Sequence, residues 1–299
     1  MTSLAQPDIL CIGALLWDVI GRGPAAMAAG DDMPGRITRR PGGVALNVAT
    51  ALARHGLRPA LLGAVGQDPE GDALIACCAA IGLETAYLHR SATHPTDIYM
   101  AIESGQTVLA AIADAAGLEA AGAAILTPLT EGPLGTAQAP FGGTVVLDGN
   151  LTDAGLAAIA TDPCFAAADL RVAPASPGKA TRIAPLLCHP RATIYVNRAE
   201  AGLLAGQGFA DAPQAAAALL GRGARRVLVT DGADAAALAG PDGVIVRRPA
   251  PVQVAHVTGA GDALMAAHIA AERAGAAPGA ALEAALGGAA RHVAAGPAA

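Results

Sequence analysis

The sequence contains few aromatic residues and no excess of basic ones. Aromatic side chains make up 2% of the 299 residues, whereas hydrophobic residues make up 53%, so alanine must supply much of the core. The net charge of −6 argues against an extended nucleic-acid surface, which normally presents a basic patch to phosphates. A small anionic ligand remains compatible with this charge, because a few backbone N–H groups can hold it locally.

Paired cysteines and long apolar runs are also missing. The five cysteines are odd in number and show no CxxC spacing, which argues against a disulfide framework or a zinc site and favours a reducing cytoplasm. The first apolar run, residues 9–16, lacks a basic leader and is too short for a membrane span or a secretion signal. We interpret it as a buried first strand. Glycine, proline or charged residues interrupt every later apolar run, so no association with a membrane is expected.

The remaining sequence alternates between two kinds of segment. Short apolar runs such as PALLGAVG, GTVVLDGN, ATIYVN and RRVLVTDG are separated by alanine- and leucine-rich segments of helical length. This alternation predicts parallel strands joined by crossover helices, and hence a layered, doubly wound α/β sheet. Asp68 before Pro69 is typical of a helix N-cap, and Gly56 and Gly82 stand where helices should end.

Two stretches break this alternation. Residues 21–40 are rich in glycine, proline and charge, and residues 96–114 have the pattern of two strands around Ser104 and Gly105. Together they predict a small sheet that projects from the core and could cover a ligand. An ordinary surface hairpin fits the spacing equally well.

A glycine-rich turn lies near the carboxyl end of the chain. Residues 257–262, VTGAGD, place Gly259 and Gly261 immediately before a predicted helix, where backbone N–H groups and the helix dipole favour an anion. Asp262 could be an N-cap. Alternatively, it could accept a proton from an attacking hydroxyl while the N–H groups stabilise a transferring phosphoryl group. Neither GxxxxGK[ST] nor a strand-linked GxGxxG occurs, which argues against P-loop and dinucleotide sites.

A second glycine pair precedes another predicted helix. Residues 41–47, PGGVALN, place Asn47 one turn inside that helix, where a buried amide needs a polar partner. Asp18 follows the first predicted strand, at the sheet edge where α/β proteins gather ligands, and could bind sugar hydroxyls. A turn or cap role for Asp18 is equally compatible with the spacing.

Polar residues also follow two later predicted strands. Asn197 and Glu200 occupy the first turn of a predicted helix and could organise hydrated Mg²⁺ near phosphates, or form a capping-box-like pair. Thr230 and Gly232 could line a phosphate or make a strand-end turn.

Two histidines and the lysine are further candidates for ligand contacts. His256 and His268 lack metal-ligand spacing, which favours packing or surface roles. Lys179 could touch a phosphate, but exposure to solvent is the usual state of a lysine and is expected here.

Taken in order, these segments resemble the ribokinase-like (PfkB) carbohydrate kinase family over nearly the whole chain. PGGVALNVATALARHG is similar to the family's N-terminal signature, GAVGQDPEGD to its next block, VNRAEAGLLAG to its NxxE segment and VTGAGDALMA to its C-terminal signature. The resemblance implies a three-layer α/β/α fold with a small β-sheet lid, the use of ATP and Mg²⁺, and phosphorylation of a primary hydroxyl on a sugar or nucleoside. Residues 1–299 would form one kinase domain, with lid segments at about 15–40 and 94–114. Pairing of lids in parts of this family implies a homodimer.

The same resemblance implies roles for individual residues. Asp262 would be the catalytic base. The sugar or nucleoside would be bound by Asp18, Gly42, Gly43, Asn47, Thr96 and Asn150, the ATP phosphates by Thr230, Gly232, Thr258, Gly259, Ala260 and Gly261, and magnesium by Asn197 and Glu200.

Within the family, LDGNLT around Asn150, APASPGK and VNRAEA most resemble the pseudouridine kinases, which implies 5′-phosphorylation of pseudouridine. A ribokinase or another nucleoside kinase is the nearest alternative, and a non-catalytic sensor of a nucleoside or sugar is an alternative of another class. His256 and Val257 replace the Asp-Thr of many sugar-kinase signatures, which leaves a requirement for a monovalent cation such as K⁺ open. Ala173 stands where an acid is expected before Pro-x-Ser, which leaves the role of that loop open.

Overall fold

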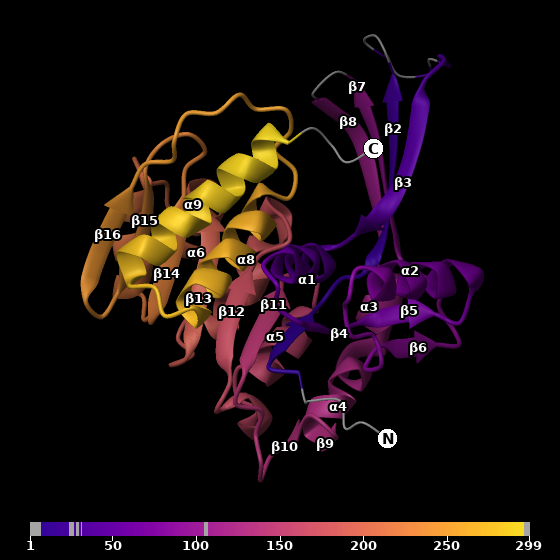
Figure 1. Cartoon of the computed structure of the whole chain (residues 1–299), viewed down its shortest axis with the longest axis horizontal. Helices are drawn as coiled ribbons and strands as arrows, with labels where there is room; N and C mark the ends of the chain where they lie inside the picture. Colours follow the sequence, from indigo (N-terminus) through magenta and orange to yellow (C-terminus); the bar gives the residue numbers. More distant parts are fainter. Residues whose placement is uncertain (1–6, 24–26, 28–29, 31, 105–106, 296–299) are drawn as a thin grey trace.

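An eight-stranded sheet forms the centre of the computed structural model, which describes residues 7–23, 27, 30, 32–104 and 107–295 (Figure 1). The strand order is β16-β15-β14-β13-β12-β11-β1-β4, with parallel pairing from β4 to β14 and antiparallel pairing of the last two strands. The strands are β1 (Ile9–Ile12), β4 (Ala60–Leu62), β11 (Thr144–Asp148), β12 (Asp169–Ala173), β13 (Ala192–Asn197), β14 (Arg226–Thr230), β15 (Ala236–Gly240) and β16 (Gly243–Arg247).

Helices cover both faces of this sheet and enclose two hydrophobic cores. Alternate residues of β1 belong to different cores, Leu10 and Ile12 to one and Ile9 and Cys11 to the other, as the two-residue period of a strand requires. One face packs against α1 (Val44–Arg54), α2 (Pro69–Ala80), α8 (Ala260–Arg273) and α9 (Pro278–Ala294). The other packs against α3 (Ala116–Ala121), α4 (Thr127–Thr130), α5 (Asp153–Ile159), α6 (Arg198–Ala205), α7 (Ala212–Gly221) and the 3₁₀ segments η1 (Gly122–Leu126), η2 (Pro163–Phe165) and η3 (Pro177–Leu186). The predicted three-layer, doubly wound fold is confirmed.

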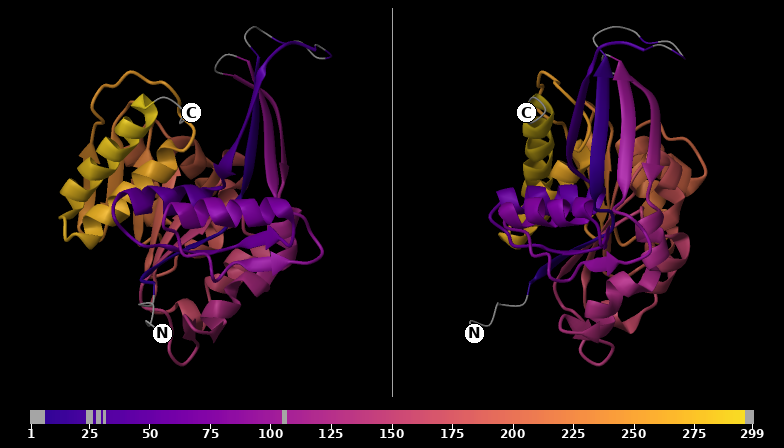
Figure 2. Two further views of the ribbon diagram at one scale, coloured as in Figure 1. Left: turned by 45° about the vertical axis from the view of Figure 1, so that its right-hand side comes forward. Right: turned by 90° about the vertical axis from the view of Figure 1, so that its right-hand side faces the viewer.

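A separate four-stranded sheet, which we call the lid, projects from this body, as the views in Figure 2 show, and confirms the predicted small sheet. Its order is β3-β2-β7-β8, and Gly105 of the predicted hairpin lies outside the described residues. The lid strands are β2 (Leu16–Gly23), β3 (Arg36–Gly42), β7 (Ile98–Ser104) and β8 (Thr107–Asp114); two smaller sheets pair β5 (Ala64–Gly66) with β6 (His89–Ser91) and β9 (Glu131–Gly132) with β10 (Gly135–Thr136).

The two faces of the lid differ in character. Register places Asp18 opposite Tyr99, and both line the large cavity of the molecule. The residues that alternate with them along the strands point away from the cavity. Among these, Met100, Ile102 and Ile112 are 50%, 42% and 71% exposed. The inner face of the lid therefore carries the polar side chains of Asp18 and Tyr99, and the outer face is apolar at these three exposed positions.

The base of the lid is joined to the body through Trp17. Its indole Nε1 donates a hydrogen bond of 3.0 Å to the backbone carbonyl of Glu70 at the start of α2. The guanidinium of Arg39 lies 3.8 Å from the ring centroid, and the tryptophan is 6% exposed. This side chain therefore connects two lid strands to a helix of the core.

The apolar run at residues 9–16 is not one strand, contrary to the sequence interpretation. β1 ends at Ile12, and Leu16 already begins the lid strand β2. Gly13 lies so close to Asp148 that a Cβ atom there would overlap the carboxylate, and the chain turns at this point. PALLGAVG divides in the same way into β4 and β5, which belong to different sheets.

The predicted helix ends are confirmed. The Asp68 carboxylate caps α2 by accepting a 2.7 Å hydrogen bond from the Gly71 N–H. Gly56 and Gly82 have left-handed φ angles of 77° and 83° after α1 and α2.

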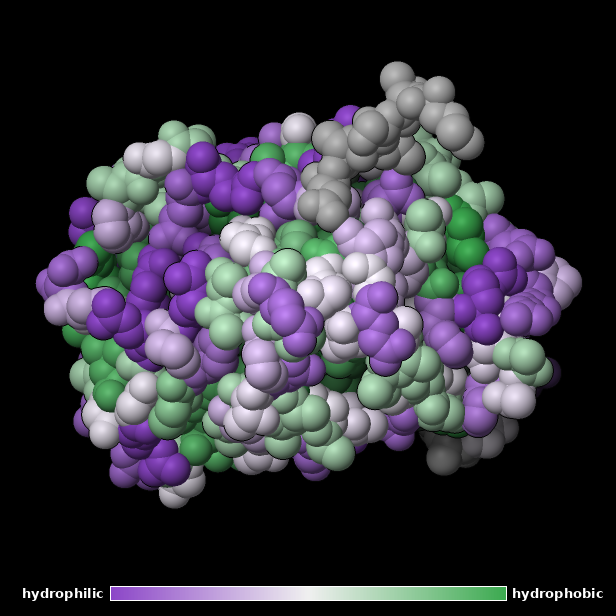
Figure 3. Space-filling model, turned by 90° about the horizontal axis from the view of Figure 1, so that it is seen from below, coloured by the Kyte–Doolittle hydropathy of each residue, from purple (hydrophilic) through white to green (hydrophobic). Residues whose placement is uncertain are grey.

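The surface seen from below mixes hydrophilic and hydrophobic residues over small areas (Figure 3). Among the helices of the described residues, none combines the length and the apolar character needed to cross a membrane.

Candidate active site

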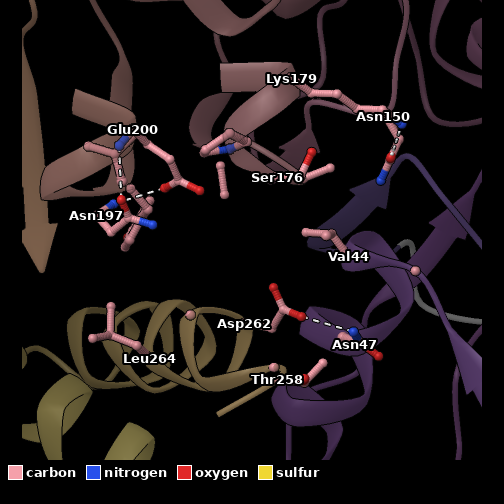
Figure 4. Close-up of a pocket in the computed structure, with 18 of the residues that line it drawn as sticks. Val44, Asn47, Asn150, Ser176, Lys179, Asn197, Glu200, Thr258, Asp262 and Leu264 are labelled. Carbon is pink, nitrogen blue, oxygen red and sulfur yellow. Dashed lines mark hydrogen bonds between the residues drawn. The ribbon is translucent and has the colours of Figure 1, made fainter. Parts of the chain in front are cut away.

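A cavity of about 550 Å³ lies where the lid meets the carboxyl ends of the central strands (Figure 4). Its walls come from β2, β7 and β8 of the lid, from the loops after β11, β12 and β13, and from the first turns of α1 and α8. Open α/β sheets bind ligands at this edge, and the volume suits a small molecule.

Asp262 lies in the first turn of α8 and faces this cavity. It is not the helix N-cap, because Gly259 holds that position with a left-handed φ of 82°. One carboxylate oxygen, Oδ2, accepts a 2.9 Å hydrogen bond from Asn47 Nδ2. Burial raises the pKa of Asp262 to about 7, the Asn47 hydrogen bond opposes this, and Asp148 and Asp18 add to it. A carboxylate with this pKa can accept a proton near neutral pH.

Asn47 owes its position to Gly43. This glycine precedes α1 with a φ of 98°, and a Cβ atom there would overlap the carbonyl of Ala14. α1 can therefore start close to the first turn of the chain, and Asn47 reaches the cavity one turn later. The polar partner expected for this amide, which is half-buried in the structure, is Asp262.

Asp18 lies within the lid strand β2, so the turn and cap alternatives are wrong. It lines the cavity, with Arg40 Nε 3.6 Å from its Oδ2. Burial raises the pKa of Asp18, and the charge of Arg40 opposes this shift. Gly42 does not line the cavity, but a Cβ atom there would overlap the Asp18 carboxylate. Gly42 therefore makes room for Asp18.

Asn197 and Glu200 form a capping box at the start of α6. Asn197 Oδ1 accepts from the Glu200 N–H at 2.9 Å, and Glu200 Oε2 accepts from the Asn197 N–H at 2.9 Å. Both residues also line the cavity, and burial raises the pKa of Glu200. The capping alternative is thus confirmed. It is compatible with a hydrated magnesium ion, because an amide and a carboxylate offer the oxygen ligands that this ion takes.

The residues expected along phosphates separate into two groups. The cavity is lined by Thr230, Thr258, Gly259 and Gly261, but not by Ala260 or Gly232. The Ala260 N–H donates a 3.1 Å hydrogen bond to the Val257 carbonyl, so it is engaged within the loop. Gly232 makes a turn after β14 with a φ of 59°.

Thr96 is placed outside the cavity lining, contrary to its expected role with the substrate. Its hydroxyl donates 2.6 Å to Asp68 Oδ1 and accepts 3.0 Å from the Gly66 N–H, and the residue is 3% exposed. Thr96 therefore fixes the N-cap of α2, which no pattern in the sequence indicated.

Asp148 is a site residue that the sequence reasoning missed. It ends β11, is fully buried, and its Oδ2 accepts from the N–H groups of Ala14 at 2.9 Å and Ala45 at 3.0 Å. Its Oδ1 accepts from the Asn150 N–H at 2.8 Å. One carboxylate therefore joins the turn before the lid, the start of α1 and the Asn150 loop. Its place at the end of a strand was the available signal.

Lys179 lines the cavity, so the expectation of a solvent-facing side chain was wrong. Its Nζ donates a 2.8 Å hydrogen bond to Asn150 Oδ1 (Figure 4). Asn150 lines the cavity as expected for a substrate-binding residue.

The two histidines have packing roles, as predicted. His268 is fully buried, with Nδ1 2.7 Å from the hydroxyl of Tyr195. The ring of His256 packs edge-on against His292 with 4.8 Å between centroids. His292 Nε2 lies 2.8 Å from the Thr258 carbonyl oxygen, next to the glycine-rich turn.

Comparison with known proteins assigns the family. A family model described as pfkB family carbohydrate kinase matches residues 6–295, and the chain therefore belongs to this family. It is an ATP-dependent kinase that acts on a hydroxyl group of a small molecule. The resemblance found in the sequence is confirmed.

Individual relatives agree with this assignment. The pseudouridine kinase of Escherichia coli (strain K12) is 30% identical over 272 residues, which cover 86% of this chain and 81% of that protein. The structure of Arabidopsis thaliana ribokinase complexed with ribose and ATP has a TM-score of 0.76 at 20% identity, covering 99% of this chain and 95% of that chain. For Thermotoga maritima ribokinase the TM-score is 0.78 at 19% identity, with 96% and 93% covered. The two structures establish a shared fold.

Proposed function

We propose that this kinase transfers the γ-phosphoryl group of ATP to the 5′-hydroxyl of pseudouridine. The observation that carries the proposal is the pairing of Asp262 with Asn47 beside the glycine turn of α8, in a cavity that also contains Asp18 and Asn150. The choice of acceptor is supported by the E. coli relative, which is a pseudouridine kinase.

Asp262 is the proposed base. Its carboxylate accepts the proton of the 5′-hydroxyl as the hydroxyl oxygen bonds to phosphorus and the bond to ADP breaks. The glycines at 259 and 261 let backbone N–H groups at the start of α8 face the transferring group without an intervening Cβ. Asp18, Asn47 and Asn150 orient the acceptor.

Thr230 and Thr258 line the proposed phosphate side of the cavity. Asn197 with Glu200, which also line it, would hold the hydrated magnesium ion. Bound Mg²⁺ would neutralise phosphate charge. The lid excludes water when it closes over the acceptor, which limits wasteful hydrolysis of ATP.

We further propose that residues 1–299 act as one kinase domain and that two copies pair through their lids. Support comes from the apolar outer face around Met100, Ile102 and Ile112, which one chain leaves exposed.

The test is an ATP-consumption assay of the full chain with Mg²⁺ against pseudouridine, uridine, adenosine, ribose and fructose 6-phosphate. Pseudouridine and uridine share the ribose and differ in the base edge, so this pair isolates recognition of the base. We expect the highest kcat/KM with pseudouridine. Inactivity towards every nucleoside contradicts the proposed acceptor, and activity confined to ribose indicates a ribokinase. Parallel assays in KCl and NaCl measure the requirement for a monovalent cation.

A further inference from the structure

Lys179 is exceptional in the composition of the chain. Of the 19 lysine and arginine residues, it is the single lysine, and every other basic side chain is an arginine. Surface positions that could carry lysine therefore carry arginine throughout. The single lysine of the chain lies among the residues that line the cavity.

Lys179 follows the strand that lies between the two strands leading to the other polar residues of the cavity. It belongs to η3, which follows β12. In the sheet, β12 lies between β11, which leads to Asn150, and β13, which leads to Asn197 and Glu200. Lys179 and Asp262 reach the cavity from opposite sides (Figure 4). The ammonium group lies 2.8 Å from Asn150 Oδ1, beside the proposed acceptor region.

The ionisable side chains that line the cavity are mostly acidic. Among the described residues that line it, Asp18, Glu200 and Asp262 carry carboxylates, and Lys179 alone carries a positive charge. A triphosphate is repelled by such a set unless positive groups lie close to its oxygens. Besides the proposed Mg²⁺, Lys179 is the one basic side chain among these lining residues that can supply such a group.

The partner of Lys179 leaves its charge available. Asn150 Oδ1 is a neutral acceptor that takes one N–H of the lysine, so two further N–H donors remain for a ligand. Asn150 is itself held by the buried carboxylate of Asp148, which accepts from its backbone N–H at 2.8 Å. The lysine is therefore positioned through an amide and not neutralised by a carboxylate.

We propose that Lys179 binds the γ-phosphoryl group of ATP and follows it during transfer to the acceptor, an assignment that rests on the proposed kinase reaction. The acceptor oxygen forms the new bond to phosphorus, the bond to the ADP oxygen breaks, and Asp262 takes the proton. Lys179 forms no covalent bond and keeps its protons. A compact ammonium on a flexible stem suits oxygens that move, whereas the planar fork of arginine fixes one geometry.

Titration of ATP and of ADP, each with Mg²⁺ and without acceptor, isolates the γ-phosphoryl contact. We expect Lys179→Met to weaken ATP binding about tenfold or more, as for loss of a charge-assisted hydrogen bond, and to change ADP binding less than about twofold. Relative to Lys179→Met, the variant Lys179→Arg should restore ATP binding more fully than it restores kcat. Arg54→Met, at the exposed end of α1, is the control with the same change in net charge.

Equal weakening of ATP and ADP, or weakening of the acceptor alone, would overturn the proposal. The comparison needs no turnover, so it decides the role of Lys179 even if no tested acceptor is phosphorylated and the proposed function fails. Circular dichroism and thermal melting of each variant establish that it is folded.

The wild-type chain offers a second measurement that needs no variant. An acyl-phosphate derivative of ATP acylates a nearby amine; an amide bond forms at Nζ, the anhydride bond breaks, and ATP and a proton leave. We expect the acyl group on Lys179, with stronger protection by ATP than by ADP. Labelling confined to the chain's terminal amine would contradict a lysine at the γ-phosphoryl position.

Discussion

The side-chain amide of Asn47 is hydrogen-bonded to the carboxylate of Asp262, 2.9 Å away in space and 215 residues away in sequence. The bond joins the first turn of α1 to the first turn of α8, and a glycine with a left-handed φ precedes each of these turns. The two signature segments of the family therefore form one unit. The orientation of Asp262, the proposed catalytic base, therefore depends on the first turns of both helices.

Replacing the base should abolish turnover and spare binding. Asp262→Asn keeps the shape of the side chain but accepts no proton, so kcat should fall by about 10³-fold while the dissociation constant of the acceptor changes little. Steady-state kinetics and calorimetry measure the two quantities. Unchanged kcat would remove Asp262 from the mechanism, and a sensor without catalysis would show binding but no turnover in the wild type.

The pH profile should report the same group. Because the base acts when deprotonated, kcat/KM should rise with pH through about 7, the pKa of Asp262, and level off above it. The Asn47 hydrogen bond lowers this pKa against the larger effect of burial. Asn47→Ala should therefore move the rise to higher pH. A profile that moves to lower pH, or does not move, would contradict this link.

Stability should depend on pH through Asp262 as well. Its pKa in the folded chain is raised from 3.8 to about 7, so its contribution favours folding at low pH and is lost as pH rises through that interval. Asp262→Asn removes the titrating group and therefore removes this loss of stability. Relative to wild type, the variant should gain about 2–4 °C in Tm at pH 8 and less at pH 5, as scanning calorimetry would measure. An equal difference at both pH values would argue against a buried charge.

Much of the site could be predicted because family signatures contain both the residue and its local structure. Asp262, Asn47 and Gly43 each lie beside a helix start that glycine marks in the sequence, and the structure brings all three to one cavity. The positions expected for Lys179 and Thr96 were wrong, and the reason is physical. Their surroundings depend on which loops become neighbours when the sheet forms, and no local pattern contains that information.

The break between β1 and β2 has the same origin. Residues 9–16 are apolar apart from Gly13, and the strand ends at Ile12, where Gly13 approaches Asp148 from a distant segment. Periodicity cannot detect such an ending, because it depends on tertiary contacts.

Asp148 should be important for stability although it does not line the cavity. Asp148→Ala leaves the N–H groups of Ala14, Ala45 and Asn150 without their acceptor, at a cost of about 1–3 kcal/mol for each unsatisfied buried group. Urea denaturation should show a loss of several kcal/mol, with Asp72→Ala on the exposed face of α2 as control. A loss below about 1 kcal/mol would mean that other acceptors replace the carboxylate.

The lid pairing has a direct test in the oligomeric state. Ile112→Asp puts a charge on the exposed outer face, opposite Met100 in the register, and should convert a dimer to a monomer in sedimentation experiments. Val244→Asp, at an exposed position of β16, is the matched control. A monomeric wild type would contradict the proposed dimer directly.

Trp17 is the chain's single tryptophan, and it occupies the junction of lid and body. Selectively excited indole fluorescence therefore arises from one defined point, which contacts a lid arginine on one side and the start of α2 on the other. The protein thus contains one intrinsic fluorophore at the point where the proposed closure of the lid would change the surroundings of the ring. Binding of each substrate can be followed at this junction without attaching a dye or altering a residue.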